Sequence, residues 1–326
     1  MGLSAAPPAR HGATAGHRRR EGGDGLRAPA SVPALPRARA SGLTAAVLAW
    51  GDGNRRDLPW RRTRDPWLVL VSEVMLQQTQ VARVLGPYHR FTRRFPTVGD
   101  CAATDMAEIV RAWAGLGYNR RAVNLHRAAT AVVDGHGGRV PADLASLRAL
   151  PGVGEYTARA VLVFAHEHPL GVVDTNVARL LARCVAGRRL PPAAAQSLAD
   201  RLVPADRAWG YNQAMLDLGS LHCTATVPSC DRCPLRRRCA WARAGRPAPD
   251  PAVGSAGVSR RQPTFAGSDR QGRGRLVAAL RAGALGAEAV AAAAGWPEEP
   301  GRAQRAVAGL VADGLARWDG DHLRLA

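Results

Sequence analysis

The fold is decided by the segment LPGVGEYTA, residues 150–158, which joins two amphipathic helical stretches. Gly152 and Gly154 allow the backbone to approach a phosphate closely, and the helix that follows offers unpaired N–H groups at its N-terminus. Pro and Gly are also common in ordinary connections between helices. The full pattern, with Val153 between the glycines, is more specific than two glycines alone, so it predicts a hairpin that binds the DNA backbone independently of base sequence.

Around this segment, from residue 43 to about residue 240, amphipathic helical stretches of ordinary length follow one another and are separated by Gly or Pro. That range contains no convincing alternating strand pattern. The clearest helical stretches are 67–85, 105–113, 121–133, 156–165, 175–185 and 211–222. The sequence therefore predicts an all-α domain over residues 43–244.

Three further segments flank or follow this domain. Residues 1–42 are rich in Arg, Pro and Gly without periodicity, which predicts a disordered tail. Residues 245–268 are rich in Pro, Gly and Ser, as in a linker. Residues 269–326 contain three helical stretches and a hairpin that turns at Asp319-Gly320, which predicts a winged-helix-like module. The charge of this module is nearly balanced, so packing or protein contact is as well supported as DNA contact.

The composition favours a polyanionic partner, nucleic acid first. The 326-residue chain carries a formal charge of +19, and all 45 of its basic residues are arginine. GC-rich coding explains the choice of Arg over Lys but not the excess of cations over carboxylates. The sequence contains no run of about eighteen apolar residues, which is the length needed to span a bilayer. No apolar stretch follows Arg18-Arg19-Arg20 either, so we expect a cytoplasmic protein without a signal peptide.

Four cysteines form a compact array with the spacing C-x6-C-x2-C-x5-C: Cys223, Cys230, Cys233 and Cys239. Four thiolates in one short loop can surround a single metal centre. A disulfide framework does not suit a chain without an export signal. Zinc also accepts four cysteines, although zinc ribbons usually contain two C-x2-C pairs and this array contains one. The residues alone thus predict a metal site and leave zinc and an iron–sulfur cluster open.

Two carboxylates are candidates for catalysis. Asp174 follows an apolar stretch and starts a helix, where an aspartate is ordinarily an N-cap; Asn176 is an alternative capping residue. Glu73 has apolar neighbours on both sides, which indicates a buried helix. A buried carboxyl must be paired or must stay protonated near neutral pH. A raised pKa is what a general acid requires.

The hairpin, Val173-Asp174 and the cysteine loop occur in the order found in the helix-hairpin-helix, or endonuclease III, superfamily of DNA glycosylases. The string SEVMLQQTQV, residues 72–81, closely resembles the MutY-type A/G-specific adenine DNA glycosylases. The resemblance covers about residues 43–240. It implies a six-helix lobe over about 66–175 and an iron–sulfur lobe from about 43–65 plus 176–244, with a [4Fe–4S] cluster on the four cysteines.

By this resemblance, Glu73 protonates a ring nitrogen of adenine, and Asp174 stabilises the positive charge that develops on the sugar. Tyr156 and Asn176 are expected in the same catalytic site. Bifunctional relatives have a Schiff-base lysine in the hairpin region, where this chain has Tyr156. The chain contains no lysine at all, so only its N-terminal amine could form an imine. The sequence therefore argues against efficient β-lyase activity.

Four residues resemble DNA contacts of the MutY type. Trp60 and Arg61 lie in LPWR, residues 58–61, which resembles a segment near the adenine pocket; a structural Trp with an exposed Arg explains Arg61 about equally well. Tyr118 follows Gly-Leu-Gly and corresponds to a tyrosine that wedges beside the damaged guanine. Gln78 would fill space in the opened duplex. Asn119 stands where many relatives have a second tyrosine.

The resulting expectation is a monomeric, nucleoid-associated base excision repair enzyme that flips out and removes adenine mispaired with 8-oxoguanine or guanine in double-stranded DNA. The module after the linker is too short for the nucleotide-hydrolase-like domain of many MutY proteins, and it resembles a short form expected in GC-rich actinobacteria. One alternative is a thymine or uracil mismatch glycosylase, and Glu73 is the feature that distinguishes an adenine glycosylase from it. The other is a non-catalytic iron–sulfur DNA-binding protein. An endonuclease III-like lyase is disfavoured by the missing lysine.

Overall fold

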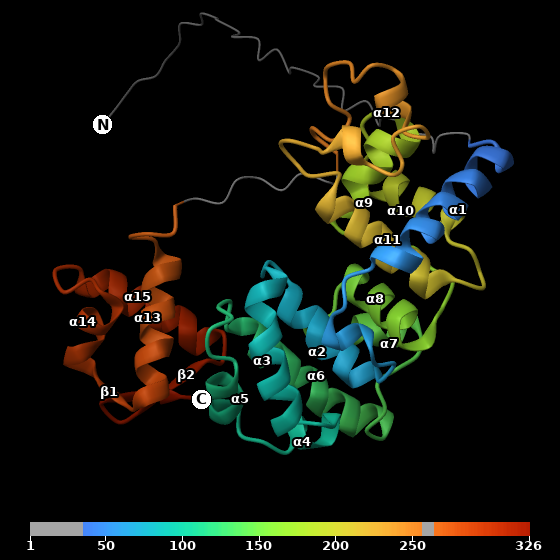
Figure 1. Ribbon diagram of the computed structural model, residues 1–326. Coiled ribbons are helices and arrows are strands. Elements are labelled where there is room, and N and C mark those ends of the chain that lie inside the picture. The colour runs from blue at the N-terminus through green and yellow to red at the C-terminus, as the bar shows by residue number, and fades with distance from the viewer. Residues whose placement is uncertain (1–34, 256–263) are drawn as a thin grey trace, which may run out of the picture. The chain divides into compact units, whose positions relative to one another are not determined.

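The computed structural model describes residues 35–255 and 264–326, which all belong to one compact unit (Figure 1). Every regular element within residues 35–255 is helical, so the all-α prediction is confirmed. Three hydrophobic cores organise these residues. None of the helices in the two described ranges combines the length and apolar character that a bilayer span requires.

The first core is built by seven consecutive helices, which bury their apolar faces against one another. They are α2 (Pro66–Leu76), α3 (Val81–Arg94), α4 (Val98–Ala102), α5 (Met106–Ala112), α6 (Arg120–His136), α7 (Leu144–Ala149) and α8 (Glu155–His166). Leu58 and Trp60, from the short 3-10 turn η1 (Pro59–Arg61), also pack here. These two residues thus pack with this lobe, whereas the expected division of the domain assigned all of residues 43–65 to the other one.

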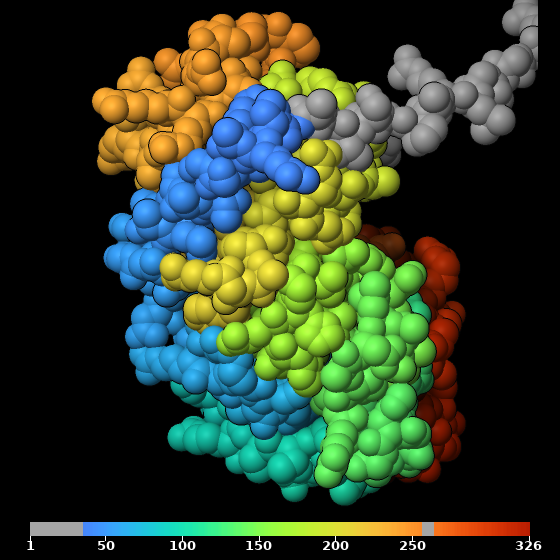
Figure 2. All heavy atoms as spheres, turned by 90° about the vertical axis from the view of Figure 1, so that its right-hand side faces the viewer, coloured from blue at the N-terminus to red at the C-terminus, as the bar shows by residue number. Residues whose placement is uncertain are grey.

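The second core joins the start of the domain to its end. It contains α1 (Arg37–Asn54), α9 (Thr175–Leu180) with the π-helical turn Leu181–Ala186, α10 (Pro192–Leu202) and α11 (Ala208–Leu221), and α12 (Ala240–Arg243) follows the cysteine loop. Helices α1 and α11 lie side by side (Figure 2), where a side chain at Gly51 would come within 2.6 Å of Ala214. The chain must therefore fold back on its own beginning to complete this core.

The C-terminal module, residues 264–326, forms the third core. It consists of α13 (Asp269–Ala282), α14 (Val290–Ala294), α15 (Pro300–Ala312) and an antiparallel sheet of β1 (Leu285–Gly286), β2 (Ala316–Asp319) and β3 (His322–Leu325) in the order β1-β3-β2. The expected hairpin pairs Ala316 with Leu325 and turns at Gly320, whose φ is 57°. The short strand β1, which the sequence did not reveal, completes a winged-helix-like arrangement.

Three expected boundaries are wrong. Helix α1 begins at Arg37, inside the segment expected to be disordered to residue 42, because residues such as Leu43 and Val47 recur on a face that the second core buries; residues 1–34 lie outside the described residues. The start of the expected linker, residues 245–268, packs against the domain, since Asp250 forms an ion pair with the buried Arg183 at 2.5 Å. Residues 256–263 of this segment are not described. The expected helix 67–85 is two helices, separated by a turn at residues 77–80.

Candidate active site

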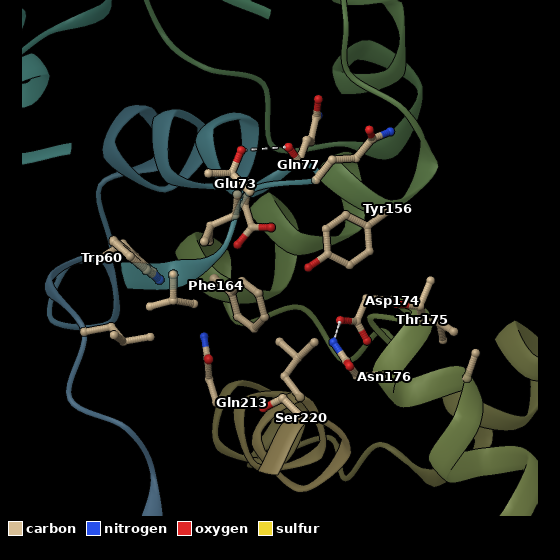
Figure 3. A pocket seen from close by; sticks show the side chains of 18 of the residues that line it. Trp60, Glu73, Gln77, Tyr156, Phe164, Asp174, Thr175, Asn176, Gln213 and Ser220 are labelled. Carbon is tan, nitrogen blue, oxygen red and sulfur yellow. Dashed lines mark hydrogen bonds between the residues drawn. The ribbon is translucent and has the colours of Figure 1, made fainter. Parts of the chain in front are cut away.

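A cavity of about 1170 Å³ lies between the helices of the first two cores. Its walls come from η1, α2 and α8 on one side and from α9 and α11 on the other (Figure 3). Apolar side chains such as Trp60 and Phe164 line it together with a few polar groups, among them Glu73, Tyr156 and Asp174. A cleft of mostly apolar character with a few converging polar groups is the arrangement expected of a binding site for a small organic group.

Glu73 projects from α2 into this cavity, and only 5% of it is exposed. Its Oε2 atom is buried and has no hydrogen-bond partner among the described residues. Burial raises the pKa of Glu73 to about 7; the nearby charge of Asp174 raises it too, whereas a hydrogen bond from Tyr156 and the charge of Arg61 oppose the shift. Near neutral pH this side chain can therefore hold a proton and present it to a group in the cavity.

Asp174 is the N-cap of α9, as the local sequence indicates. Its Oδ1 accepts a hydrogen bond from the Val177 N–H at 2.7 Å, and its Oδ2 accepts one from Asn176 Nδ2 at 2.6 Å. Burial raises the pKa of Asp174, and these hydrogen bonds oppose that shift because they favour the carboxylate. Asp174 thus has donors that stabilise its negative charge, which Glu73 largely lacks.

Tyr156 lies in the first turn of α8 with its hydroxyl directed toward the space between the two carboxyls (Figure 3). The nearby hydroxyl favours the ionised form of Glu73, and so it opposes the rise in the pKa of that carboxyl. Burial and the charges of Glu73 and Asp174 raise the pKa of Tyr156 well above its usual value. The phenol therefore remains neutral beside the two carboxyls.

Comparisons with known proteins identify the family. Residues 71–204 match the HhH-GPD superfamily of base excision DNA repair proteins. An adenine DNA glycosylase from Mycobacterium tuberculosis (strain ATCC 25618 / H37Rv) is 43% identical over 275 residues, which cover 82% of this chain and 88% of the relative. The chain belongs to the adenine DNA glycosylase family. The human adenine DNA glycosylase is 40% identical over 216 residues, which cover 62% of this chain and 40% of the human protein.

Two solved structures share the fold. A thermostable thymine-DNA glycosylase superposes with a TM-score of 0.61 at 30% identity and covers 64% of this chain and 98% of that protein. A trapped endonuclease III–DNA covalent intermediate superposes with a TM-score of 0.58 at 24% identity and covers 66% of this chain and 100% of that chain. The expected helix-hairpin-helix glycosylase fold is confirmed.

The hairpin that joins α7 to α8 requires its glycines. Gly152 has a φ of 76°, and a side chain there would come within 2.6 Å of Asn124 on α6. Gly154 is the N-cap of α8. The side chain of Val153 is buried, and its N–H donates to the Leu150 carbonyl. The contact of residues 152–154 with the DNA backbone stays a prediction.

Gln78 and Tyr118 lie in two loops that one buried arginine joins. Both residues have left-handed backbone, with φ of 54° and 46°, and Tyr118 is 42% exposed. Arg121 donates hydrogen bonds to the carbonyls of Met75 and Gln77 at the end of α2, and to those of Leu116 and Gly117 on the other loop. It thereby ends α2 and explains the break in the expected helix 67–85. No sequence signal distinguishes Arg121 from a surface arginine, and it was missed.

Arg61 is not the exposed arginine of the alternative interpretation, and it lines the cavity beside Trp60. It is 8% exposed, and its guanidinium donates two hydrogen bonds to Asp217, at 2.7 and 2.9 Å. The side chain of Arg56 also donates a hydrogen bond to the Asp217 carboxylate, at 2.7 Å. Burial alone would raise the pKa of Asp217, but the hydrogen bonds from these arginines lower it below its usual value. The ion pair between Arg61 and Asp217 joins η1 to α11 at the wall of the cavity.

We expect Asp217→Asn to lower the free energy of unfolding by about 3–5 kcal/mol, because it leaves buried Arg61 without its counter-charge. Chemical denaturation followed by circular dichroism measures this loss. Asp57→Asn is the matched control, since the Asp57–Arg62 ion pair is exposed and should contribute less than about 1 kcal/mol. Equal losses in the two variants would contradict the assignment.

The four cysteines of the array line one small cavity beside the second core. Among the described residues, no group of three or more His, Cys, Asp or Glu side chains has an arrangement that could hold a metal ion. Arg183 is buried there and donates a hydrogen bond to Cys223 Sγ at 3.5 Å. Arg179 joins the Cys223 carbonyl (3.0 Å) to Asn176 Oδ1 (2.7 Å), so hydrogen bonds run from this loop to Asp174.

Proposed function

We propose that this protein is a monofunctional DNA N-glycosylase that hydrolyses the bond between deoxyribose and adenine mispaired with 8-oxoguanine or guanine in double-stranded DNA. Family membership supports adenine as the base and DNA as the partner. The observation that carries the mechanism is the buried, unpartnered carboxyl oxygen of Glu73, which faces the same cavity as Asp174. We further propose that the protein acts as a monomer in the cytoplasm, associated with the nucleoid.

In the proposed reaction, protonated Glu73 transfers its proton to a ring nitrogen of the flipped adenine. The glycosidic bond then breaks and its electron pair leaves with the base, so positive charge develops on the sugar. The carboxylate of Asp174 stabilises this charge electrostatically. Water adds to the anomeric carbon and loses a proton to Glu73, which restores the acid and leaves an abasic site. Extruding the base from the duplex requires a few kcal/mol of binding energy.

Gln213 offers a physical reason for the choice of adenine, and it was missed in the sequence. It comes from α11, is 4% exposed and lines the cavity across from Glu73. A glutamine amide can donate to and accept from one adenine edge at the same time, whereas thymine presents a different pattern. Together with a proton donor for a purine nitrogen, this favours adenine excision over the alternative of thymine or uracil excision.

The proposed function is tested by incubating the protein with duplexes that contain A opposite 8-oxoguanine, A opposite G, or T opposite G. Adenine should be released from the first two, and strand breaks should appear only after alkali, because the chain has no lysine for imine chemistry. Excision of thymine instead of adenine would establish the mismatch glycosylase alternative. Strand breaks without alkali would contradict the monofunctional assignment.

The rate of base excision should depend on pH with a maximum. Glu73, whose pKa is raised to about 7, acts as an acid, so the rate should fall about tenfold per pH unit above 7 as the proton is lost. Asp174 acts as an anion, so its protonation should lower the rate at the acid end. Single-turnover rates between pH 4 and 9 measure both limbs. A rate that rises steadily with pH would contradict the assignment of Glu73 as an acid.

We also propose that Cys223, Cys230, Cys233 and Cys239 hold a [4Fe–4S] cluster. The thiols fit such a group because all four line one cavity, where the Arg183 guanidinium donates a hydrogen bond to Cys223 Sγ. The cluster would supply rigidity to the loop rather than chemistry at the glycosidic bond. Anaerobically purified protein should contain about four iron and four sulfide per chain, and Cys223→Ser should lose most of both, whereas Cys101→Ala should retain them. Stoichiometric zinc instead would contradict the proposal.

A further inference from the structure

The C-terminal module packs directly against the first lobe. Val110 of α5 and Val123 of α6 are fully buried within the third core, together with residues of α13 and β3. Helix α13 and strand β3 both contact α5. Asp313 of the module also pairs with Arg120 at 3.4 Å. A shared apolar core of this kind holds the two parts together more firmly than a linker would.

One polar contact of this interface reaches the loop that carries Tyr118. Arg281, near the end of α13, donates one hydrogen bond to the Val110 carbonyl at 3.0 Å and another to Asn119 Oδ1 at 2.9 Å. Asn119 is the residue next to Tyr118. The module therefore holds this loop at a side chain that the sequence comparison left without a role.

The loop needs such support because its backbone is unusual. Gly115, Gly117 and Tyr118 all have positive φ, at 87°, 70° and 46°. Left-handed backbone at a tyrosine persists only where surrounding contacts hold it. Arg121 holds the loop from within through the Leu116 and Gly117 carbonyls. Arg281 adds a contact from the module, so the loop lies between two arginines that belong to different parts of the chain.

We propose that the C-terminal module is a positioning element for the loop 115–119, and that Arg281 is its positioning residue. This inference rests on the proposed function and on the expectation from the sequence that Tyr118 wedges beside the damaged guanine. Arg281 acts through Asn119 and does not touch DNA. The module's own residues 269–326 contain eight arginines and seven acidic residues, which is consistent with a packing role and not with a strongly cationic DNA-binding surface.

A double-mutant cycle tests the proposal. Arg281→Ala and Asn119→Ala should each lower the single-turnover rate on A opposite 8-oxoguanine about tenfold, the effect of losing a hydrogen bond to a charged group. The double variant should be no slower than the slower single variant, because both remove the same contact. Arg305→Ala is the control: it removes the same charge from an exposed site on α15 and should keep the wild-type rate. Melting curves verify that all variants fold.

The salt dependence of duplex binding separates positioning from direct phosphate contact. If Arg281 positions the loop, Arg281→Ala should bind an undamaged duplex with the same salt slope as the wild type. A slope reduced by about one would assign Arg281 to a phosphate and overturn the proposal. Additive rate effects in the cycle, or an unchanged rate for Arg281→Ala, would also overturn it. A wild-type protein without adenine excision would instead refute the proposed function, so the two failures are distinguishable.

Discussion

Replacing Glu73 with glutamine is expected to slow adenine release by about 10²–10⁴-fold, the usual contribution of a general acid. Glutamine has nearly the same size and polarity, so the cavity and α2 should keep their shape, but its amide cannot supply an acidic proton. The comparison requires single-turnover rates on A opposite 8-oxoguanine for the variant and the wild type. The variant should also lose the alkaline limb of the pH profile, because that limb reports the ionisation of Glu73.

Glu73→Gln should not lower the free energy of unfolding above pH 7, although it slows adenine release. The folded pKa of about 7 exceeds the ordinary value of 4.5, so the wild type loses stability as pH rises between these values, by up to about 3 kcal/mol. Glu73→Gln does not have to bury a charge and should therefore be at least as stable as the wild type above pH 7. Glu298→Gln, at an exposed position, is the control and should change neither property. A slow and unstable Glu73→Gln variant would indicate a structural role instead.

Replacing Asp174 with asparagine is expected to slow adenine release by about 10²–10³-fold, the usual effect of removing one preorganised electrostatic partner of the transition state. The variant keeps an oxygen that can accept the Val177 N–H, and Asn caps helices about as well as Asp. Its melting temperature should thus stay close to that of the wild type. Any loss of rate then reports the missing negative charge and not a damaged helix.

Asp143 provides a matched control for this experiment. It is the N-cap of α7, and its Oδ1 accepts the Ser146 N–H at 2.9 Å, so Asp143→Asn makes the same chemical change at a cap outside the cavity. We expect this variant to release adenine at the wild-type rate. If Asp174→Asn were equally active, Asp174 would be only a cap, and the proposed stabilisation of the sugar cation would be wrong.

The sequence by itself determined the helical fold, the hairpin at residues 150–158, the cysteine spacing and both carboxylates. Each of these depends on local spacing: helical periodicity places apolar residues on one face, and a hairpin or metal loop needs given residue types at given separations. The burial of Glu73 could be predicted for the same reason, since its immediate neighbours along the helix are apolar.

Only the tertiary structure decided how Arg61, Arg121, Arg281 and Gln213 are used. In the sequence the three arginines resemble solvated cations, yet one closes a buried ion pair with Asp217, one joins two loops and one holds Asn119 from the C-terminal module. Their partners lie on segments far away along the chain. Whether a charged side chain is solvated or buried depends on how those segments pack, and local spacing carries no record of that packing.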